Sequence, residues 1–197
     1  MFRRLVRLGS FTACWRQVNV TPIQKGPPSS FVDNYRPFSI TSVLSKVFER
    51  LVSVRLGRFM EYSGVLPTTQ FYYRKGLGTC DALLCLSHTL QSALESAQEA
   101  RIGQNNFSAA FDRVNQWGIL YRLCSVGIGC FVLSILTQFL SNRSQHVMVD
   151  GYRSKLVDVA SGVPQGSVLG PLLFLLYTSE FFPFRTISCS VMLMTPL

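Results

Sequence analysis

The sequence predicts an α+β fold, because its helical segments are interrupted by a β-hairpin and do not alternate regularly with strands. Apolar residues recur at helical spacing in four segments: 41–62, 81–94, 117–126 and 130–140. A hairpin is predicted after the fourth segment, since Asp150-Gly151 separates two strand-like runs, 146–149 and 152–159. This order argues against a doubly wound parallel sheet.

The long first helix is predicted to bury an apolar stripe and to turn its charged residues away from the core. The stripe consists of Leu44, Val47, Phe48, Leu51, Leu56 and Phe59, and the residues off it are Lys46, Glu49, Arg50, Ser53 and Arg58. Asp81 is a favourable N-cap for the second helix. Residues 168–180 predict a last, apolar helix, with Gly170-Pro171 near its start.

The composition favours an intracellular protein with a polyanionic partner. Lys and Arg total 19 against 10 Asp and Glu, and the formal charge of +9 favours a polyanion such as nucleic acid, with a basic solvated surface as the alternative. The six cysteines form no C-x-x-C pair, which predicts reduced thiols, no zinc site and a nuclear or cytoplasmic location. The basic N-terminus is a poor secretion signal, and no apolar run is long enough to span a bilayer.

Residues 105–114 predict a strand end, a tight turn of small residues and the start of a helix. Such a corner presents side chains at the C-terminal edge of a sheet, a usual place for ligands in α/β folds. Phe111 and Asp112 lie on the far side of this turn. The corner is therefore the first candidate for a functional site.

Four stretches in this order resemble the reverse transcriptase of non-LTR (LINE-type) retrotransposons. They are residues 34–39 with the 46–52 helix, 70–82, 106–114 and 162–174. The last one, Gly-Val-Pro-Gln-Gly-Ser-Val-Leu-Gly-Pro-Leu-Leu-Phe, is long and specific. The resemblance implies a right-hand polymerase architecture of fingers and partial palm, with helices packed on a small antiparallel sheet.

The same resemblance implies a division of the chain into three parts. Residues 1–17 form a basic N-terminal segment, residues 18–182 the fingers and partial palm, and residues 183–197 a poorly ordered tail. The family's partners are an RNA template, a DNA primer and deoxynucleotides. No membrane partner is expected, and the oligomeric state is left open.

Several positions match family residues that face the incoming nucleotide. Phe111 matches the bulky residue under the sugar, Gln165 and Gly166 match the loop beside the nucleotide, and Arg36 matches an arginine near the triphosphate. The weaker candidates for phosphate or nucleic-acid contact are Lys25, Arg74 and Lys75. Taken singly, Phe111 is better explained as a core residue and the cations as solvated surface charge. Within the matched motifs, the functional interpretation is favoured for Phe111, Gln165 and Arg36.

The family's catalytic positions are not intact in this sequence. Its chemistry uses two Mg²⁺ ions held by carboxylates, and the first of these aspartates is replaced here by Asn106. Asp112 belongs to the same motif but is not the family's metal ligand. No Asp-Asp pair occurs anywhere in the chain. The sequence therefore predicts a catalytically inactive chain that retains no Mg²⁺.

The tail offers an explanation for the missing pair. Codons for a family-like Gly-Tyr-Ala-Asp-Asp-Ser-Thr-Leu, such as GGT TAT GCT GAT GAC TCC ACT TTG, give Val-Met-Leu-Met-Thr-Pro-Leu when read one base late. The chain ends in that same heptapeptide, residues 191–197. The hypothesis is a shift of reading frame between about Phe181 and Val191. A truncated reverse transcriptase is thus the main interpretation, with a non-catalytic nucleic-acid-binding remnant, or no function, as alternatives.

Overall fold

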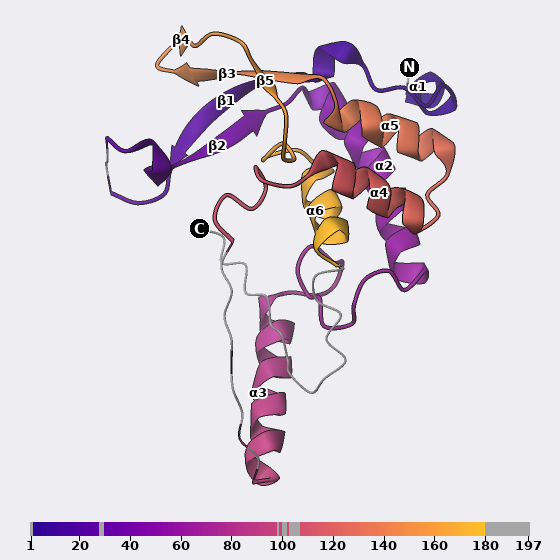
Figure 1. Cartoon of the computed structure of the whole chain (residues 1–197), viewed down its shortest axis with the longest axis vertical. Helices are drawn as coiled ribbons and strands as arrows, with labels where there is room; N and C mark the ends of the chain where they lie inside the picture. Colours follow the sequence, from indigo (N-terminus) through magenta and orange to yellow (C-terminus); the bar gives the residue numbers. More distant parts are fainter. Residues whose placement is uncertain (1, 28–29, 98, 100–101, 103–106, 180–197) are drawn as a thin grey trace.

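The computed structural model describes the chain except for residues 1, 28–29, 98, 100–101, 103–106 and 180–197. Its described part contains helices and one small sheet, which confirms the α+β fold class (Figure 1). The helices are α1 Phe2–Arg7, α2 Val43–Tyr62, α3 Thr79–Glu95, α4 Gln116–Ser125, α5 Cys130–Leu140 and α6 Gly170–Thr178. The strands are β1 Gln17–Gln24, β2 Tyr35–Ile40, β3 Arg143–Val149, β4 Tyr152–Arg153 and β5 Val157–Val159.

The sheet is mixed, which corrects the expectation of an antiparallel one. β1 pairs antiparallel with β2 and parallel with β3, while β4 and β5 pair antiparallel with β3. A parallel pair needs a long crossover, and here the crossover from β2 to β3 contains helices α2 to α5. The predicted hairpin is confirmed: Asp150 and Gly151 have φ of 49° and 83°, as its two-residue turn requires.

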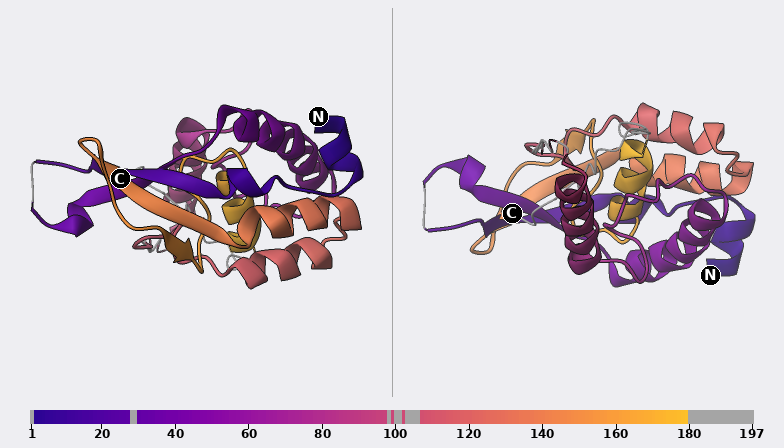
Figure 2. Two further views of the ribbon diagram at one scale, coloured as in Figure 1. Left: turned by 90° about the horizontal axis from the view of Figure 1, so that it is seen from above. Right: turned by 90° about the horizontal axis from the view of Figure 1, so that it is seen from below.

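Helix α6 occupies the middle of the helical layer, with α2 on one side and α4 and α5 on the other (Figures 1 and 2). It is apolar on nearly all sides, a pattern that requires burial all round. Four consecutive residues of it are almost inaccessible: Leu173, Phe174, Leu175 and Leu176. The hydrophobic core is therefore built around this helix.

The N-terminal segment contributes to the same core. Phe11 and Trp15 are buried, and their rings contact each other with centroids 5.4 Å apart. Phe11 also meets Phe139 of α5 edge-on at 5.5 Å, and Trp15 lies 5.8 Å from Phe48 of α2. This part of residues 2–17 thus packs against helices α2 and α5, and the proposed division at residue 17 stays a prediction.

The buried face of α2 differs from the predicted stripe. Leu44, Val47 and Leu51 are about half exposed, whereas Glu49 is fully buried. The face that packs inward consists of Ser45, Phe48, Glu49, Val52, Leu56 and Met60. Glu49 is buried because its Oε2 accepts hydrogen bonds from the N–H groups of Val168 and Leu169, at 2.8 and 3.3 Å. Those groups lie at the start of α6 and have no acceptor within the helix.

Helix α3 stands apart from the other helices in Figure 1 and buries little of its surface. Ala82 is its one fully buried residue, and Leu94 is 72% exposed. Its N-cap is Gly78, not Asp81 as predicted. Asp81 is the third helical residue, and its Oδ2 accepts a hydrogen bond from the Gly78 N–H at 2.7 Å. An acidic residue three positions after the cap is the reciprocal half of a capping box.

Replacing Glu49 is expected to destabilise the protein strongly. Glu49→Ala leaves two N–H groups at the start of α6 and the Ser45 hydroxyl, which donates to Oε1 at 2.8 Å, without an acceptor. Unsatisfied buried donors cost about 1–3 kcal/mol each, so the free energy of unfolding should fall by about 2 kcal/mol or more. Urea-induced unfolding measures the loss. Glu95→Ala, at the exposed end of α3, is the matched control, and equal unfolding midpoints for the two variants would contradict this role.

Candidate functional site

The corner that follows residue 106 is a tight turn held by its own backbone. Ala109 has a positive φ of 53°, and its carbonyl accepts hydrogen bonds from the N–H groups of Asp112 and Arg113 at 3.0 and 3.1 Å. The turn is followed by buried Val114 and by α4. Asn106, the position of the family's metal-binding aspartate, lies outside the described residues.

The loop between β5 and α6 docks directly onto this corner. The N–H of Val163 donates to the Phe111 carbonyl at 2.8 Å, and the N–H of Gly162 donates to the Val114 carbonyl at 2.8 Å. A side chain at Gly162 would put its Cβ 2.7 Å from the carbonyl oxygens of both Phe111 and Asp112, and its φ is +81°. Only glycine allows this approach. Two motifs about 50 residues apart are thus joined by backbone bonds.

Gln165 holds the carboxylate of the corner. Its Nε2 lies 3.1 and 3.0 Å from the two oxygens of Asp112. Burial raises the pKa of Asp112, while the Gln165 hydrogen bond and the charge of Lys25 oppose that rise. The structure therefore brings together Gln165, predicted to border the nucleotide, and Lys25, predicted to contact phosphate. The Nζ of Lys25 also donates to the Asp33 carbonyl at 2.9 Å.

Phe111 is wedged between two aromatic rings. It stacks on Phe174 of α6 with ring centroids 4.8 Å apart and planes inclined by 17°, and Tyr73 meets it edge-on at 6.3 Å. Tyr73 was not singled out from the sequence, because the polar, aromatic and glycine-rich composition of residues 70–79 does not show which ring meets the corner. Its positive φ of 57° turns this residue toward the corner's aromatic group. The Phe111 ring is thus fixed on two sides while remaining only partly buried.

Strand β2 brings the fingers motif to the same place. The N–H of Ser39 donates to the Gln165 carbonyl at 2.8 Å, and a Cβ on Gly166 would lie 2.8 Å from the ring of Phe38. Gly166 has a φ of +95°, so this close contact also requires glycine. Arg36 shares its face of the strand with Phe38, since alternate residues point the same way. The Nη2 of Arg36 is buried and has no hydrogen-bond partner within the described residues.

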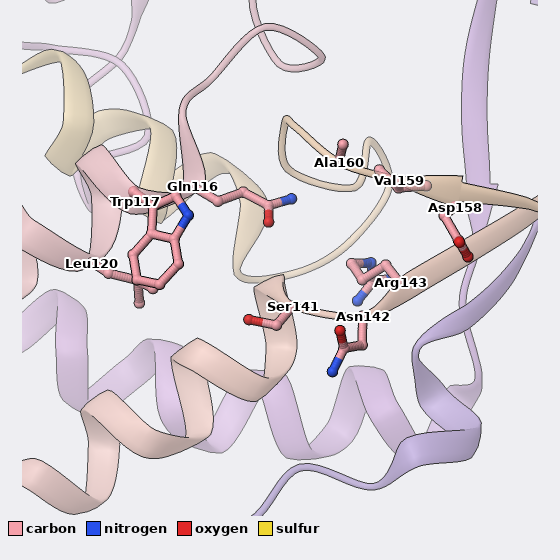
Figure 3. A pocket seen from close by; sticks show the side chains of 9 residues that line it. All are labelled: Gln116, Trp117, Leu120, Ser141, Asn142, Arg143, Asp158, Val159 and Ala160. Carbon is pink, nitrogen blue, oxygen red and sulfur yellow. The ribbon is translucent and has the colours of Figure 1, made fainter.

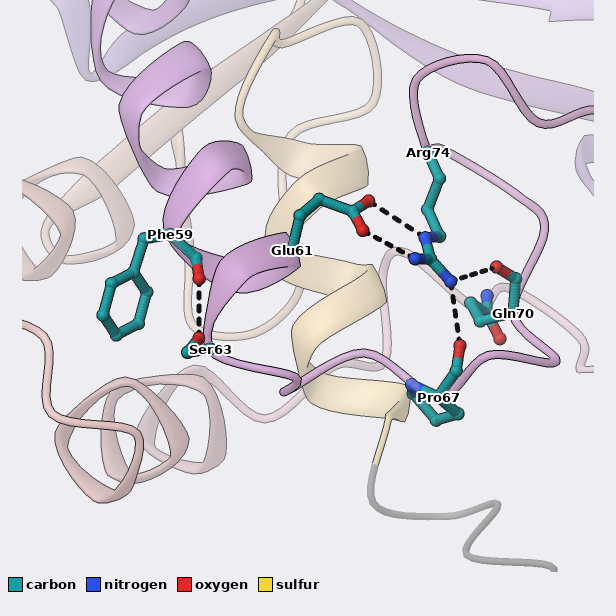
Figure 4. A network of polar contacts seen from close by, with 6 residues as sticks. All are labelled: Phe59, Glu61, Ser63, Pro67, Gln70 and Arg74. Carbon is teal, nitrogen blue, oxygen red and sulfur yellow. Dashed lines mark hydrogen bonds and ion pairs between the residues drawn. The ribbon is translucent and has the colours of Figure 1, made fainter.

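Arg74 is engaged in a local network at the end of α2 (Figure 4). Its guanidinium pairs with Glu61 through two hydrogen bonds of 2.9 and 2.6 Å, and its Nη1 donates to the carbonyls of Pro67 and Gln70. This pairing lowers the pKa of Glu61. The network ties the end of α2 to the loop that carries Tyr73. Lys75 is exposed beside it.

The described residues of the corner do not fit a two-metal site. Asp112 is the one carboxylate there, and both of its oxygens face the amide donor of Gln165. Within the described ranges, no three His, Cys, Asp or Glu side chains gather closely enough to hold a metal ion. Mg²⁺ prefers carboxylate oxygens, which also offset its charge.

Within the described ranges of the chain, no helix is both long and apolar enough to cross a bilayer.

Comparison with known families agrees with the arrangement of these motifs. Residues 23–190 match the family described as Reverse transcriptase (RNA-dependent DNA polymerase). The chain therefore belongs to the reverse transcriptase family.

Its relatives are encoded by mobile elements. The chain is 34% identical over 181 residues to the RNA-directed DNA polymerase from mobile element jockey of Drosophila melanogaster, and 34% to the probable RNA-directed DNA polymerase from transposon X-element of the same species. Each alignment covers 91% of this chain and 20% of the relative. A third relative, the putative 115 kDa protein in type-1 retrotransposable element R1DM, is 32% identical over 88% of the chain and 16% of its own length. The predicted resemblance to non-LTR retrotransposon reverse transcriptases is confirmed, and the chain spans about a fifth of these relatives.

The carboxyl group of Asp112 leads to a prediction about how the stability of the protein depends on pH. Because burial raises the pKa of Asp112, the folded state binds its proton more tightly than the unfolded state. Asp112 thus favours folding at acidic pH and loses that contribution as the pH rises from the ordinary aspartate pKa through the raised one. Asp112→Asn should therefore gain stability relative to the natural chain on going from acidic to neutral pH.

Urea unfolding of both proteins across that pH range measures the difference. Asp150→Asn, in the exposed hairpin turn, reports the general effect of removing one carboxylate. A natural chain that gains stability over Asp112→Asn as the pH rises would show that the Gln165 bond outweighs burial.

Proposed function

We propose that this chain is a reverse transcriptase domain that has lost nucleotidyl transfer and retains no Mg²⁺. The observation that carries the proposal is that the sequence lacks the family's metal-binding carboxylates. The family's first metal-binding aspartate is Asn106 here, and no Asp-Asp pair exists in the sequence. An amide oxygen is neutral and a poorer ligand for Mg²⁺ than a carboxylate. Asp112 does not replace the missing ligands, because its oxygens accept hydrogen bonds from Gln165.

The residues proposed to face a nucleotide support descent from an active enzyme. Phe111 is held between Phe174 and Tyr73, which suits a ring that limits the space beside a sugar. Gln165 lies between the corner and β2, because its side chain bonds Asp112 and its carbonyl accepts the N–H of Ser39. Gly166 lies against Phe38 and Ser39 of β2. Arg36 carries an unpartnered Nη2 on the neighbouring strand, which suits a phosphate contact. These assignments are proposals drawn from the family's positions.

The frame-shift hypothesis concerns residues outside the described part of the structure. Support comes from the family match, which ends at residue 190, next to the heptapeptide that a one-base shift explains. The coding DNA tests it directly. Aspartate codons in the alternative frame over residues 191–197 are expected, and their absence would overturn the hypothesis.

Primer extension tests the loss of catalysis. The purified chain with an RNA template, a DNA primer, deoxynucleotides and Mg²⁺ is expected to give no extended product. Asn106→Asp should remain inactive, because the second pair of carboxylates is still missing. A reverse transcriptase with intact carboxylates in the same reaction confirms that the conditions permit synthesis. Extension by the natural chain that disappears in Asn106→Ala would overturn the proposal.

A non-catalytic role in nucleic-acid binding is the second candidate. The observation in its favour is the charge of +9, together with the unpartnered guanidinium nitrogen of Arg36 and the exposed Lys75. Arg74 is less available, since Glu61 and two carbonyls occupy its donors. The charge of Lys25 opposes the rise that burial causes in the pKa of Asp112, so the corner contains one cation beside one anion.

Binding of single-stranded RNA should weaken steeply with salt, because each phosphate contact releases counterions. Arg36→Gln and Lys75→Gln should each weaken binding and lower the slope of log affinity against log salt by about 1. Fluorescence anisotropy of a labelled oligonucleotide over a series of salt concentrations gives that slope. Arg50→Gln, on the exposed side of α2, is the control. Salt-independent binding, or equal slopes in all variants, would contradict a phosphate role for these residues.

A further inference from the structure

A pocket of about 440 Å³ lies outside the Phe111 corner, between the start of α4, the end of α5 and the paired strands β3 and β5 (Figure 3). The side chains of Gln116, Ser141, Asn142 and Arg143 line it, with Trp117 at one end and Asp158 at the other. Gln116 connects the pocket to the corner's loop, because its Nε2 donates to the Gly162 carbonyl at 3.1 Å. The volume is in the range of small-molecule sites.

Arg143 is the buried cation of this pocket. It is 2% exposed, its Nη1 donates to the Phe139 carbonyl at 2.9 Å, and its guanidinium lies 5.2 Å from the centre of the Phe139 ring. Among the described residues, its Nη2 has no hydrogen-bond partner. Burial lowers the pKa of Arg143 to about 10, so the side chain remains charged at neutral pH. A buried charged donor without an acceptor is unfavourable, and an anionic ligand would supply one.

No carboxylate in the described part of the structure takes the position of that acceptor. Glu49 acts on Arg143 through its charge but gives its oxygens to Ser45, Val168 and Leu169. Asp158 lies at the far end of the pocket and pairs in register with Ser144, not with Arg143. Within the described residues, no ion pair joins it to Arg143. The Nη2 atom itself is covered, and the guanidinium must turn slightly toward the pocket to bond a ligand.

The start of α4 adds a second group suited to an anion. Gln116 and Trp117 form its first turn, where N–H groups have no acceptor within the helix. The Asn115 side chain caps only the N–H of Gly118, at 3.2 Å. The positive end of the helix dipole therefore lies beside the pocket on the side opposite β3.

Trp117 provides a flat aromatic surface at the pocket's open end. Trp117 is 79% exposed. Exposing a large apolar indole to water is unfavourable unless a partner covers the ring. Unpaired bases stack on exposed aromatic rings of this kind in single-strand-binding proteins. The pocket therefore offers a site for an anion beside an exposed indole, and a nucleotide has a phosphate for the first and a base for the second.

We propose that this pocket binds one nucleotide of a single-stranded nucleic acid, with its phosphate at Arg143 and the start of α4 and its base stacked on Trp117. The inference rests on the proposed nucleic-acid binding and adds a site separate from the Phe111 corner. It requires neither Mg²⁺ nor the missing carboxylates. Either RNA or DNA can supply the phosphate and the base.

Tryptophan fluorescence tests the pocket directly. The chain has two tryptophans, and Trp15 is 6% exposed in the core, so quenching by an added ligand reports on Trp117. Unlabelled oligouridylate and oligothymidylate of equal length are titrated while fluorescence is recorded, and anisotropy of a labelled strand reports binding anywhere on the protein. Quenching is expected to follow binding, with the two titrations distinguishing RNA from DNA.

Variants separate the pocket from the rest of the surface. Trp117→Ala should bind about tenfold more weakly, because one stacked base is lost. Arg143→Lys keeps the charge but loses the planar fork, and it should also weaken binding, whereas Phe131→Ala, an exposed aromatic on α5, should not. Since Arg143 is buried, thermal unfolding must show that its variant folds, and Trp117→Ala decides the question if it does not.

The outcomes distinguish the two proposals. Strand binding without quenching, and with natural affinity in Trp117→Ala, would overturn the pocket and leave nucleic-acid binding intact. No anisotropy change with either strand would overturn both. Quenching of the natural chain supports the site if Trp117→Ala and Arg143→Lys both weaken the binding measured by anisotropy, while Phe131→Ala leaves that binding unchanged.

Discussion

A helix that is apolar on every side can be buried only if the polar groups at its start find acceptors inside the core. In this protein that constraint falls on α6, and Glu49 meets it from the middle of α2. Ser167 completes the arrangement, because its hydroxyl accepts the N–H of Gly170 at 3.0 Å. These bonds hold the end of the loop that precedes α6, and the bonds of Gly162 and Val163 to the corner hold its other end. Gln165 and Gly166 lie between these two anchored ends. The candidate site thus depends on a carboxylate that takes no part in it.

The sequence predicted the fold class, the hairpin and the family, because those depend on local periodicity, turn chemistry and a long specific pattern. The sequence-based prediction failed where a contact with a distant part of the chain determines the structure. Glu49 was assigned to the solvent side of α2, since nothing local shows that the start of α6 needs an acceptor. The mixed sheet was missed for the same reason, because the neighbour of β1 is chosen by a crossover and not by its own residues.

The candidate site shows the same division. Phe111, Gln165 and Gly166 could be selected from the sequence, because they fall within motifs whose order is specific. Tyr73 and Arg143 could not, since their significance comes from an edge-on ring contact and from a buried nitrogen without a partner. Arg74 lies in a matched stretch, yet its guanidinium is committed to Glu61. Charge type alone therefore cannot separate a ligand-binding arginine from a structural one.

The parallel pairing of β1 with β3 has a consequence for how the chain folds. Gln17 is the register partner of Ser144, so this part of the sheet closes only after most of the described chain has been synthesised and collapsed. The β1–β2 hairpin is local and can form early, but the other edge of β1 has no hydrogen-bonded neighbour until β3 is in place. Pairings of such high sequence separation slow folding and prolong the exposure of strand edges to other chains. During synthesis, the N-terminal strand is the segment that most needs protection from aggregation.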